Sequence, residues 1–129
     1  RAPERQVICF VGDGGYQMTG NEISVAVERN LSIRIIVSNN GSLGTIRLYQ
    51  EKAYPDRTLA TDMANPDFAK IAEAYGAKGF KINKNEDIER VIKEAFAVDG
   101  PALIEVNASL EYLAAYINLS QIRKTVSKK

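Results

Sequence analysis

The stretch "VICFVGDGGYQMTGNE", residues 7–22, decides the fold of this chain. An apolar, β-favouring run over residues 7–11 stops at Gly12-Asp13-Gly14-Gly15, and a helical pattern begins a few residues later. A continuous apolar run of this length is typical of a strand buried on both faces. We therefore predict a buried strand whose carboxyl end carries three glycines around one carboxylate.

Helical patterns follow at two places in the first half of the chain. Thr19 and Glu22 have the spacing of a capping box, which predicts a helix that ends near Asn30. This capping role accounts for Glu22 without a catalytic one. Asn65 precedes a proline, which predicts an N-cap followed by proline in the first turn, and Gly76 is placed to end that helix.

Further strands and helices complete an alternating pattern. A second apolar run covers residues 33–37, and shorter strands are expected at 80–82 and 102–106. An amphipathic helix is expected from Glu86, and Ser120 is expected to cap a short final helix. Alternating strands and helices indicate parallel strands joined by right-handed crossovers. We predict an α/β fold, an open doubly wound and mostly parallel sheet with helices on both faces.

Length and composition suit one ordinary globular domain. The chain has 129 residues, 45% apolar and 26% charged, with a net charge of +1. The charge distribution indicates no nucleic-acid binding, and the sequence contains no apolar run of about 18 residues that would span a membrane. Because the chain begins with Arg1 rather than Met, we expect it to be the C-terminal piece of a longer protein.

Cysteine and histidine usage narrow the chemistry. The single cysteine, Cys9, lies in the first apolar run and is expected to be a core residue, which favours a reducing, cytoplasmic location. The chain contains no histidine. Proton transfer near neutral pH would therefore need a carboxylate, a cofactor or a residue from elsewhere.

Two turns with ligand-type residues end neighbouring strands. Asp13 and its glycines follow the first strand, and Asn39-Asn40-Gly41 follow the second, so both turns should share the ligand-binding edge of the sheet. Glycine amides can surround phosphate oxygens. A carboxylate beside a phosphate is favourable when Mg²⁺ lies between them. Both sequences are also common in simple turns, and this alternative remains open at this stage.

The spacing of these residues resembles a family signature. Gly12-Asp13-Gly14, 24 further residues and then Asn39-Asn40 resemble the thiamine-diphosphate motif, which ends in a double asparagine. The stretch "GDGGYQMTGNEISVAVERNLSIRIIVSNNGSLGTIR" is similar to the diphosphate-binding domain of acetolactate-synthase-like enzymes, as are "NPDFAKIAEAYGAKG" and "LSQIR". The resemblance runs from residue 3 to about residue 123.

The resemblance implies a set of site residues. Asp13 and Asn40 would bind Mg²⁺ through their side chains and Ser42 through its main-chain carbonyl, while Asn39 would shape the turn. It implies no catalytic residue on this chain. The thiamine diphosphate itself would be contacted by Gly12, Gly14, Gly15, Thr45 and Ile46.

The resemblance also implies an activity and partners. Such enzymes decarboxylate a 2-oxo acid and transfer the acyl carbanion, with a glutamate from the pyrimidine-binding domain of a neighbouring subunit activating the cofactor. We therefore expect a homodimer or homotetramer in the full-length protein, and an inactive isolated domain. "TIRLYQ" stands where acetolactate synthases often have Met-Val and a nearby Trp, so the acceptor substrate stays open.

Two alternatives and one further expectation remain. A stand-alone flavodoxin-like nucleotide-binding or regulatory module would use the same edge, although the chain has neither a P-loop nor a Gly-x-Gly-x-x-Gly motif. A noncatalytic subunit with an intact metal motif is also compatible. Residues 47–64 lack periodicity, so we expect a mobile loop there.

Overall fold

A computed structural model describes residues 5–114 and 118–126 of the chain. The chain divides into two compact units, which are treated separately. The sheet unit contains the segment that ends at Asn39 together with Asn65–Asn107, and the helix-pair unit contains Asn40–Ala64 with the segment from Ala108. Among the described residues, no helix is long and apolar enough to cross a membrane.

The sheet unit is built on four parallel strands. Their order across the sheet is β1-β2-β4-β3, so β4 lies between strands that precede it in the chain. The fold class predicted from the alternating pattern is confirmed. The strands are β1 (Val7–Gly12), β2 (Ile33–Asn39), β3 (Lys78–Ile82) and β4 (Ala102–Asn107).

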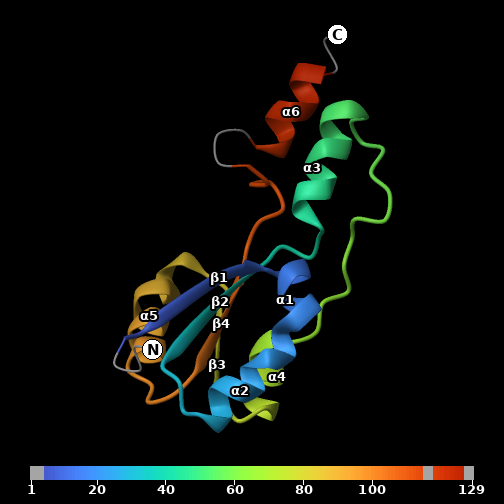
Figure 1. Ribbon diagram of the computed structural model, residues 1–129. Coiled ribbons are helices and arrows are strands. Elements are labelled where there is room, and N and C mark those ends of the chain that lie inside the picture. Colours follow the sequence, from blue (N-terminus) through green and yellow to red (C-terminus); the bar gives the residue numbers. More distant parts are fainter. Residues whose placement is uncertain (1–4, 115–117, 127–129) are drawn as a thin grey trace. The chain divides into compact units, whose positions relative to one another are not determined.

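Helices cover both faces of the sheet (Figure 1). Helices α1 (Asp13–Thr19), α2 (Ile23–Glu28) and α4 (Phe68–Ala74) contribute to one hydrophobic cluster with β2 and β4. Helix α5 (Ile88–Phe96) packs on the other face against β3 and β4. The first cluster is anchored by Tyr16, whose ring meets Phe68 edge-on at 5.4 Å between centroids.

The helix-pair unit contains α3 (Gly44–Ala53) and α6 (Leu119–Val126), which pack side by side (Figure 1). Asn118 and Gln121 cap α6 reciprocally, because each side chain accepts a hydrogen bond from the other's backbone N–H. The prediction that Ser120 caps this helix is wrong, since Ser120 lies inside α6.

The first strand is less buried than its sequence predicts. Val7, Ile8 and Phe10 are exposed, and Phe10 keeps 73% of its accessible surface. Cys9 is also exposed, so its prediction as a core residue is wrong. The reason is strand order: β1 is an outermost strand of the sheet, and α5 packs on β3 and β4 rather than on β1.

The helix after β1 also differs from the prediction. It begins at Asp13, immediately after the strand, and a 3-10 turn at Gly20–Glu22 separates it from α2. Thr19 makes no side-chain cap hydrogen bond. Thr19 is the last residue of α1 and the N-cap of the 3-10 turn, and without that hydrogen bond the capping box predicted for Thr19 and Glu22 does not form.

Two further boundaries depend on local hydrogen bonds. Helix α4 begins at Phe68, and its N-cap is Asp67, whose carboxylate accepts from the Lys70 backbone N–H at 3.0 Å. The prediction of Asn65 as the cap is therefore wrong. Gly76 adopts φ of 94° directly after this helix, which confirms its predicted role in ending it.

The predicted loop at 47–64 is partly helical, because α3 extends to Ala53. The sequence signal for this helix is weak, because its buried residue is the charged Glu51 while Ile46 and Tyr49 are exposed. After α3 the chain returns through a hydrogen bond from the Leu43 N–H to the Thr61 carbonyl, 2.8 Å, and a bridge between Ser42 and Asp62. The mobility of residues 54–64 stays a prediction.

Candidate functional site

The carboxyl ends of β1 and β2 lie at one edge of the sheet unit. Gly12, the last residue of β1, pairs with Ser38, and Asn39, the last residue of β2, pairs with Asn107. Asp13 therefore follows β1 at the edge where β2 ends. The predicted shared edge is confirmed for Asp13 and Asn39, and it is the edge at which parallel α/β sheets bind ligands.

Asp13 is a buried carboxylate in a defined orientation. It is the first residue of α1 and only 3% exposed. Its Oδ1 accepts from the Gly14 N–H at 2.9 Å, and its Oδ2 accepts from Asn65 Nδ2 at 2.6 Å. A carboxylate in the first turn of a helix is also favoured by the helix dipole. N–H donors from different segments thus orient the carboxylate.

Asn65 connects Asp13 to the interior of the sheet unit. The same Asn65 nitrogen donates to Asn39 Oδ1 at 2.8 Å, and Asn39 Nδ2 donates to Glu105 Oε1 at 2.7 Å. Glu105 is 4% exposed, and Lys81 Nζ lies 3.3 Å from its Oε2. Sequence reasoning missed Asn65 and Glu105. The available signal was a glutamate inside the apolar run of β4, "ALIEVN".

A second carboxylate shares the Lys81 ammonium. Asp67 Oδ2 lies 2.9 Å from Lys81 Nζ. The pKa of Lys81 is raised, chiefly by its hydrogen bond to Asp67 and further by Glu105, which outweigh the opposing effect of burial. Lys81 therefore stays protonated and compensates the buried Glu105 charge.

Gly12 of the motif leaves room beside Asp13, whereas a Cβ added at Gly15 would lie 3.0 Å from the Val11 side chain. Gly12 has an extended backbone with φ of −77°, and a Cβ added there would meet no atom within 4 Å. The fold therefore does not need glycine at this position for steric or conformational reasons. Gly12 and Gly15 are exposed and Gly14 is half-buried. Open space above a glycine next to a buried carboxylate is the arrangement in which a ligand can approach the backbone.

The Gly12→Ala variant tests whether Gly12 is needed for folding or for the approach of a ligand. We expect the variant to melt within about 1 °C of the wild type, because alanine adopts an extended φ without strain and its methyl group meets open space. We expect cofactor affinity to fall severalfold if the diphosphate approaches this backbone. Thermal denaturation and calorimetric titration check the two parts, and a large loss of melting temperature would contradict the steric reading.

The remaining predicted residues lie in the helix-pair unit. The Asn40 side-chain oxygen accepts from the Ser42 N–H at 3.0 Å, and the Ser42 hydroxyl donates to the Thr61 carbonyl at 2.9 Å. Ser42 is 2% exposed. Thr45 and Ile46 are exposed in the first turn of α3. Asn40 and Ser42 are thus held by hydrogen bonds within the helix-pair unit, as Asp13 is within the sheet unit.

The donor set suits magnesium. Among residues 5–114 and 118–126, no group of three or more His, Cys, Asp or Glu side chains could hold a metal ion. A cation in the sheet unit beside Asp13 would meet one buried carboxylate. Hard oxygen donors with few protein carboxylates match Mg²⁺, which usually retains water or phosphate ligands. The buried Asp13 carboxylate and the open space at Gly12 fit a magnesium-bound anion.

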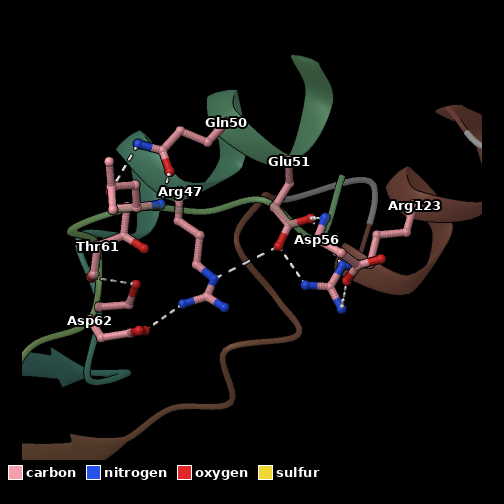
Figure 2. A network of polar contacts seen from close by, with 9 residues as sticks. Arg47, Gln50, Glu51, Asp56, Thr61, Asp62 and Arg123 are labelled. Carbon is pink, nitrogen blue, oxygen red and sulfur yellow. Dashed lines mark hydrogen bonds and ion pairs between the residues drawn. The ribbon is translucent and has the colours of Figure 1, made fainter. Parts of the chain in front are cut away.

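A polar network follows Thr45 and Ile46 along α3 (Figure 2). Glu51 is fully buried, and its carboxylate accepts from Arg123 Nε of α6 at 3.0 Å and from the Asp56 N–H at 3.0 Å. Arg47 Nε lies 4.0 Å from the same carboxylate. The pKa of Glu51 is lowered, mainly by the hydrogen bond from Arg123, against an opposing effect of burial. The network fixes α3 against α6.

The sheet unit also has an apolar hollow of about 280 Å³ between β1, β2, α1 and α2. Its lining includes Cys9, Val11, Tyr16 and Ile23. Most of the lining is apolar, Glu22 is its one carboxylate, and Asp13 is not among the lining residues, so the hollow does not have the chemistry of a metal or diphosphate site.

The fold defines a class, an α/β domain with a buried carboxylate in a glycine-rich turn at the carboxyl ends of its parallel strands. The family described as "Thiamine pyrophosphate enzyme, C-terminal TPP binding domain" matches residues 1–106. The chain belongs to this family. The cofactor of the family is thiamine diphosphate, and the flavodoxin-like alternative is not supported.

Similar proteins include acetolactate synthases of fungi and bacteria. The mitochondrial catalytic subunit of Saccharomyces cerevisiae is 38% identical over 104 residues, which cover 81% of this chain and 15% of the yeast protein. The Haemophilus influenzae large subunit is 40% identical over 97 residues, 74% of this chain and 17% of that protein. The mitochondrial enzyme of Schizosaccharomyces pombe is 34% identical over 105 residues, 81% and 16% respectively. The chain thus spans less than a fifth of these relatives.

Proposed function

We propose that this chain is the diphosphate- and magnesium-binding part of an enzyme that decarboxylates a 2-oxo acid and transfers the acyl carbanion, as acetolactate synthases do. The observation that carries the proposal is the buried Asp13 carboxylate at the sheet edge, beside open space at Gly12. The acetolactate synthases among the similar proteins support the reaction class.

Each predicted residue has a role in this proposal. Asp13 and Asn40 bind Mg²⁺ through side-chain oxygens, and Ser42 binds it through its carbonyl. Bound thiamine diphosphate supplies the electron sink for decarboxylation, and the protein supplies position and charge. The glycine amides and the start of α3 orient the cofactor through Gly12, Gly14, Gly15, Thr45 and Ile46.

The proposal requires further parts of the protein. The chain carries no histidine, and the similar enzymes are several times longer. We propose that a pyrimidine-binding domain from a neighbouring subunit supplies the activating glutamate, in a homodimer or homotetramer. A noncatalytic subunit with an intact metal motif would bind the cofactor equally well and would differ only in turnover.

The test uses the full-length protein that contains this chain. We expect calorimetric titration to show thiamine diphosphate binding that requires Mg²⁺ and disappears with EDTA, because the diphosphate needs the cation to offset the Asp13 charge. We also expect carbon dioxide release from a 2-oxo acid such as pyruvate. Absence of Mg²⁺-dependent binding would refute the proposal, and binding without turnover would favour the noncatalytic subunit.

A further inference from the structure

We propose that Asn65 and Asn39, oriented by the buried Glu105, are positioning residues that hold the Asp13 carboxylate for the metal ion. The proposal deepens the proposed function and rests on it. Asn65 and Glu105 lie 52 and 92 positions from Asp13 in the chain, and neither is a metal ligand in the predicted set. Their role is to set the direction in which the carboxylate points.

The amide of Asn65 can adopt only one favourable orientation. Its single NH₂ group donates to two oxygens, Asp13 Oδ2 at 2.6 Å and Asn39 Oδ1 at 2.8 Å. Its own Oδ1 accepts from Gln17 Nε2 at 2.7 Å. Reversal of the amide would place its oxygen against the two acceptors and its NH₂ against a donor. The hydrogen bonds at the nitrogen and at the oxygen of the Asn65 amide therefore both oppose reversal.

The orientation of Asn39 is set in turn by Glu105. An ionised carboxylate only accepts hydrogen bonds, so the nitrogen of Asn39 must face Glu105 Oε1, 2.7 Å away. The oxygen of Asn39 then faces Asn65. Asn39 thus donates to Glu105, and Asn65 donates both to Asn39 and to Asp13, so the two amides link the buried Glu105 to the Asp13 carboxylate with every donor facing an acceptor.

The Glu105 carboxylate is held in place by two neighbours. Lys81 Nζ lies 3.3 Å from its Oε2, and the Ala69 N–H donates to the same oxygen at 3.4 Å. An apolar residue at this β4 position would avoid the cost of burying a carboxylate. The position instead carries a charge whose hydrogen bonds lead to Asp13, which is what a positioning role requires.

Hydrogen bonds to Asp13 are compatible with metal binding. A carboxylate offers about four lone-pair sites over its two oxygens, so hydrogen bonds such as those from Gly14 and Asn65 can orient the group and still be combined with a metal–oxygen bond. Residues that hydrogen-bond to a metal ligand orient it, and their removal typically costs about 10- to 100-fold in metal affinity. The cost arises because the metal must then order the ligand itself.

The first test is Asn65→Ala in the full-length protein. We expect the Mg²⁺ affinity, titrated by calorimetry at saturating thiamine diphosphate, to fall about tenfold. The metal-free melting temperature should stay close to that of the wild type, because Asn65 is only half-buried and caps no helix. Asn83→Ala is the matched control, since it removes an exposed Asn–Asn side-chain hydrogen bond to Asn107 and should leave Mg²⁺ affinity unchanged.

Glu105→Gln is the second variant. Glutamine can present either an NH₂ group or an oxygen to Asn39, so it no longer fixes the orientation of the Asn39 amide, although its side chain has nearly the same volume as glutamate. We expect Mg²⁺ affinity to fall severalfold. Wild-type affinity in both Asn65→Ala and Glu105→Gln would overturn the positioning role while leaving the proposed function intact. Failure of the wild type to bind magnesium and cofactor would instead refute the proposed function.

Discussion

Asp13→Asn is expected to weaken Mg²⁺-dependent thiamine diphosphate binding by a hundredfold or more, about 2.8 kcal/mol. The substitution removes the charge that offsets the cation and keeps the size of the side chain. Asn40→Ala should cost less, because an amide oxygen contributes a dipole rather than a charge. The fold should survive, since one buried negative charge is lost from an anion-binding edge.

The hydrogen bonds of Asp13 add a second reason for the large effect. Both of its oxygens accept from N–H groups, one from Gly14 and one from Asn65. An asparagine has only one oxygen, so its NH₂ group must face one of these donors in either orientation. The variant therefore loses both the charge and the geometry of the ligand.

Calorimetric titration of the full-length protein with cofactor and Mg²⁺ measures this prediction. Asp99→Asn serves as the control, because Asp99 is exposed and its carboxylate accepts a long hydrogen bond from Asn30 at 3.4 Å. Equal affinity for wild type and Asp13→Asn would mean that the carboxylate is only a turn residue.

Arg123→Met is expected to lower the stability of α3 by about 2 kcal/mol. Removing one partner of a buried ion pair leaves the other charge uncompensated, which typically lowers stability by about 3–5 kcal/mol. The reduction here is smaller because Arg47 and the Asp56 N–H remain beside Glu51 (Figure 2). Hydrogen exchange of the Gly44–Ala53 amides should become roughly thirtyfold faster.

The same pair predicts a dependence on pH. The folded-state pKa of Glu51 lies below its ordinary value of 4.5, chiefly through the hydrogen bond from Arg123. Such a carboxyl stabilises the folded state above the unfolded pKa, and this stability is lost as the pH falls through the folded pKa. Protection of α3 should therefore decline below about pH 4.5 in the wild type and change less in Arg123→Met. Arg90→Met is the control, because its ion pairs on α5 are exposed; equal exchange in Arg123→Met and Arg90→Met would contradict a structural role for the buried pair.

Local sequence patterns predicted where strands occur better than they predicted the position of each strand in the sheet. The apolar runs predicted β2 and β4 closely, because a strand in the middle of a parallel sheet is buried whatever its position in the chain. The same reasoning failed for β1, since an edge strand can have an equally apolar sequence. Arg34 shows the opposite case: it is a fully buried charged residue in β2, and its guanidinium donates hydrogen bonds to the carbonyls of Val98 and Gly100 at 2.6 Å each.

The sequence by itself determined the α/β class, the family and the shared edge of Asp13 and Asn39. Parallel strands all end on one side, and the motif spacing is visible without coordinates. Only the tertiary structure decided the exposure of Cys9 and the role of Asn65, which sequence assigned to the core and to a helix cap. Exposure depends on which strand lies at the edge, and Asn65 meets Asp13 through a contact 52 residues apart in the chain. Neither property can be read from neighbouring residues, because the first depends on the position of β1 in the sheet and the second on a contact between distant segments.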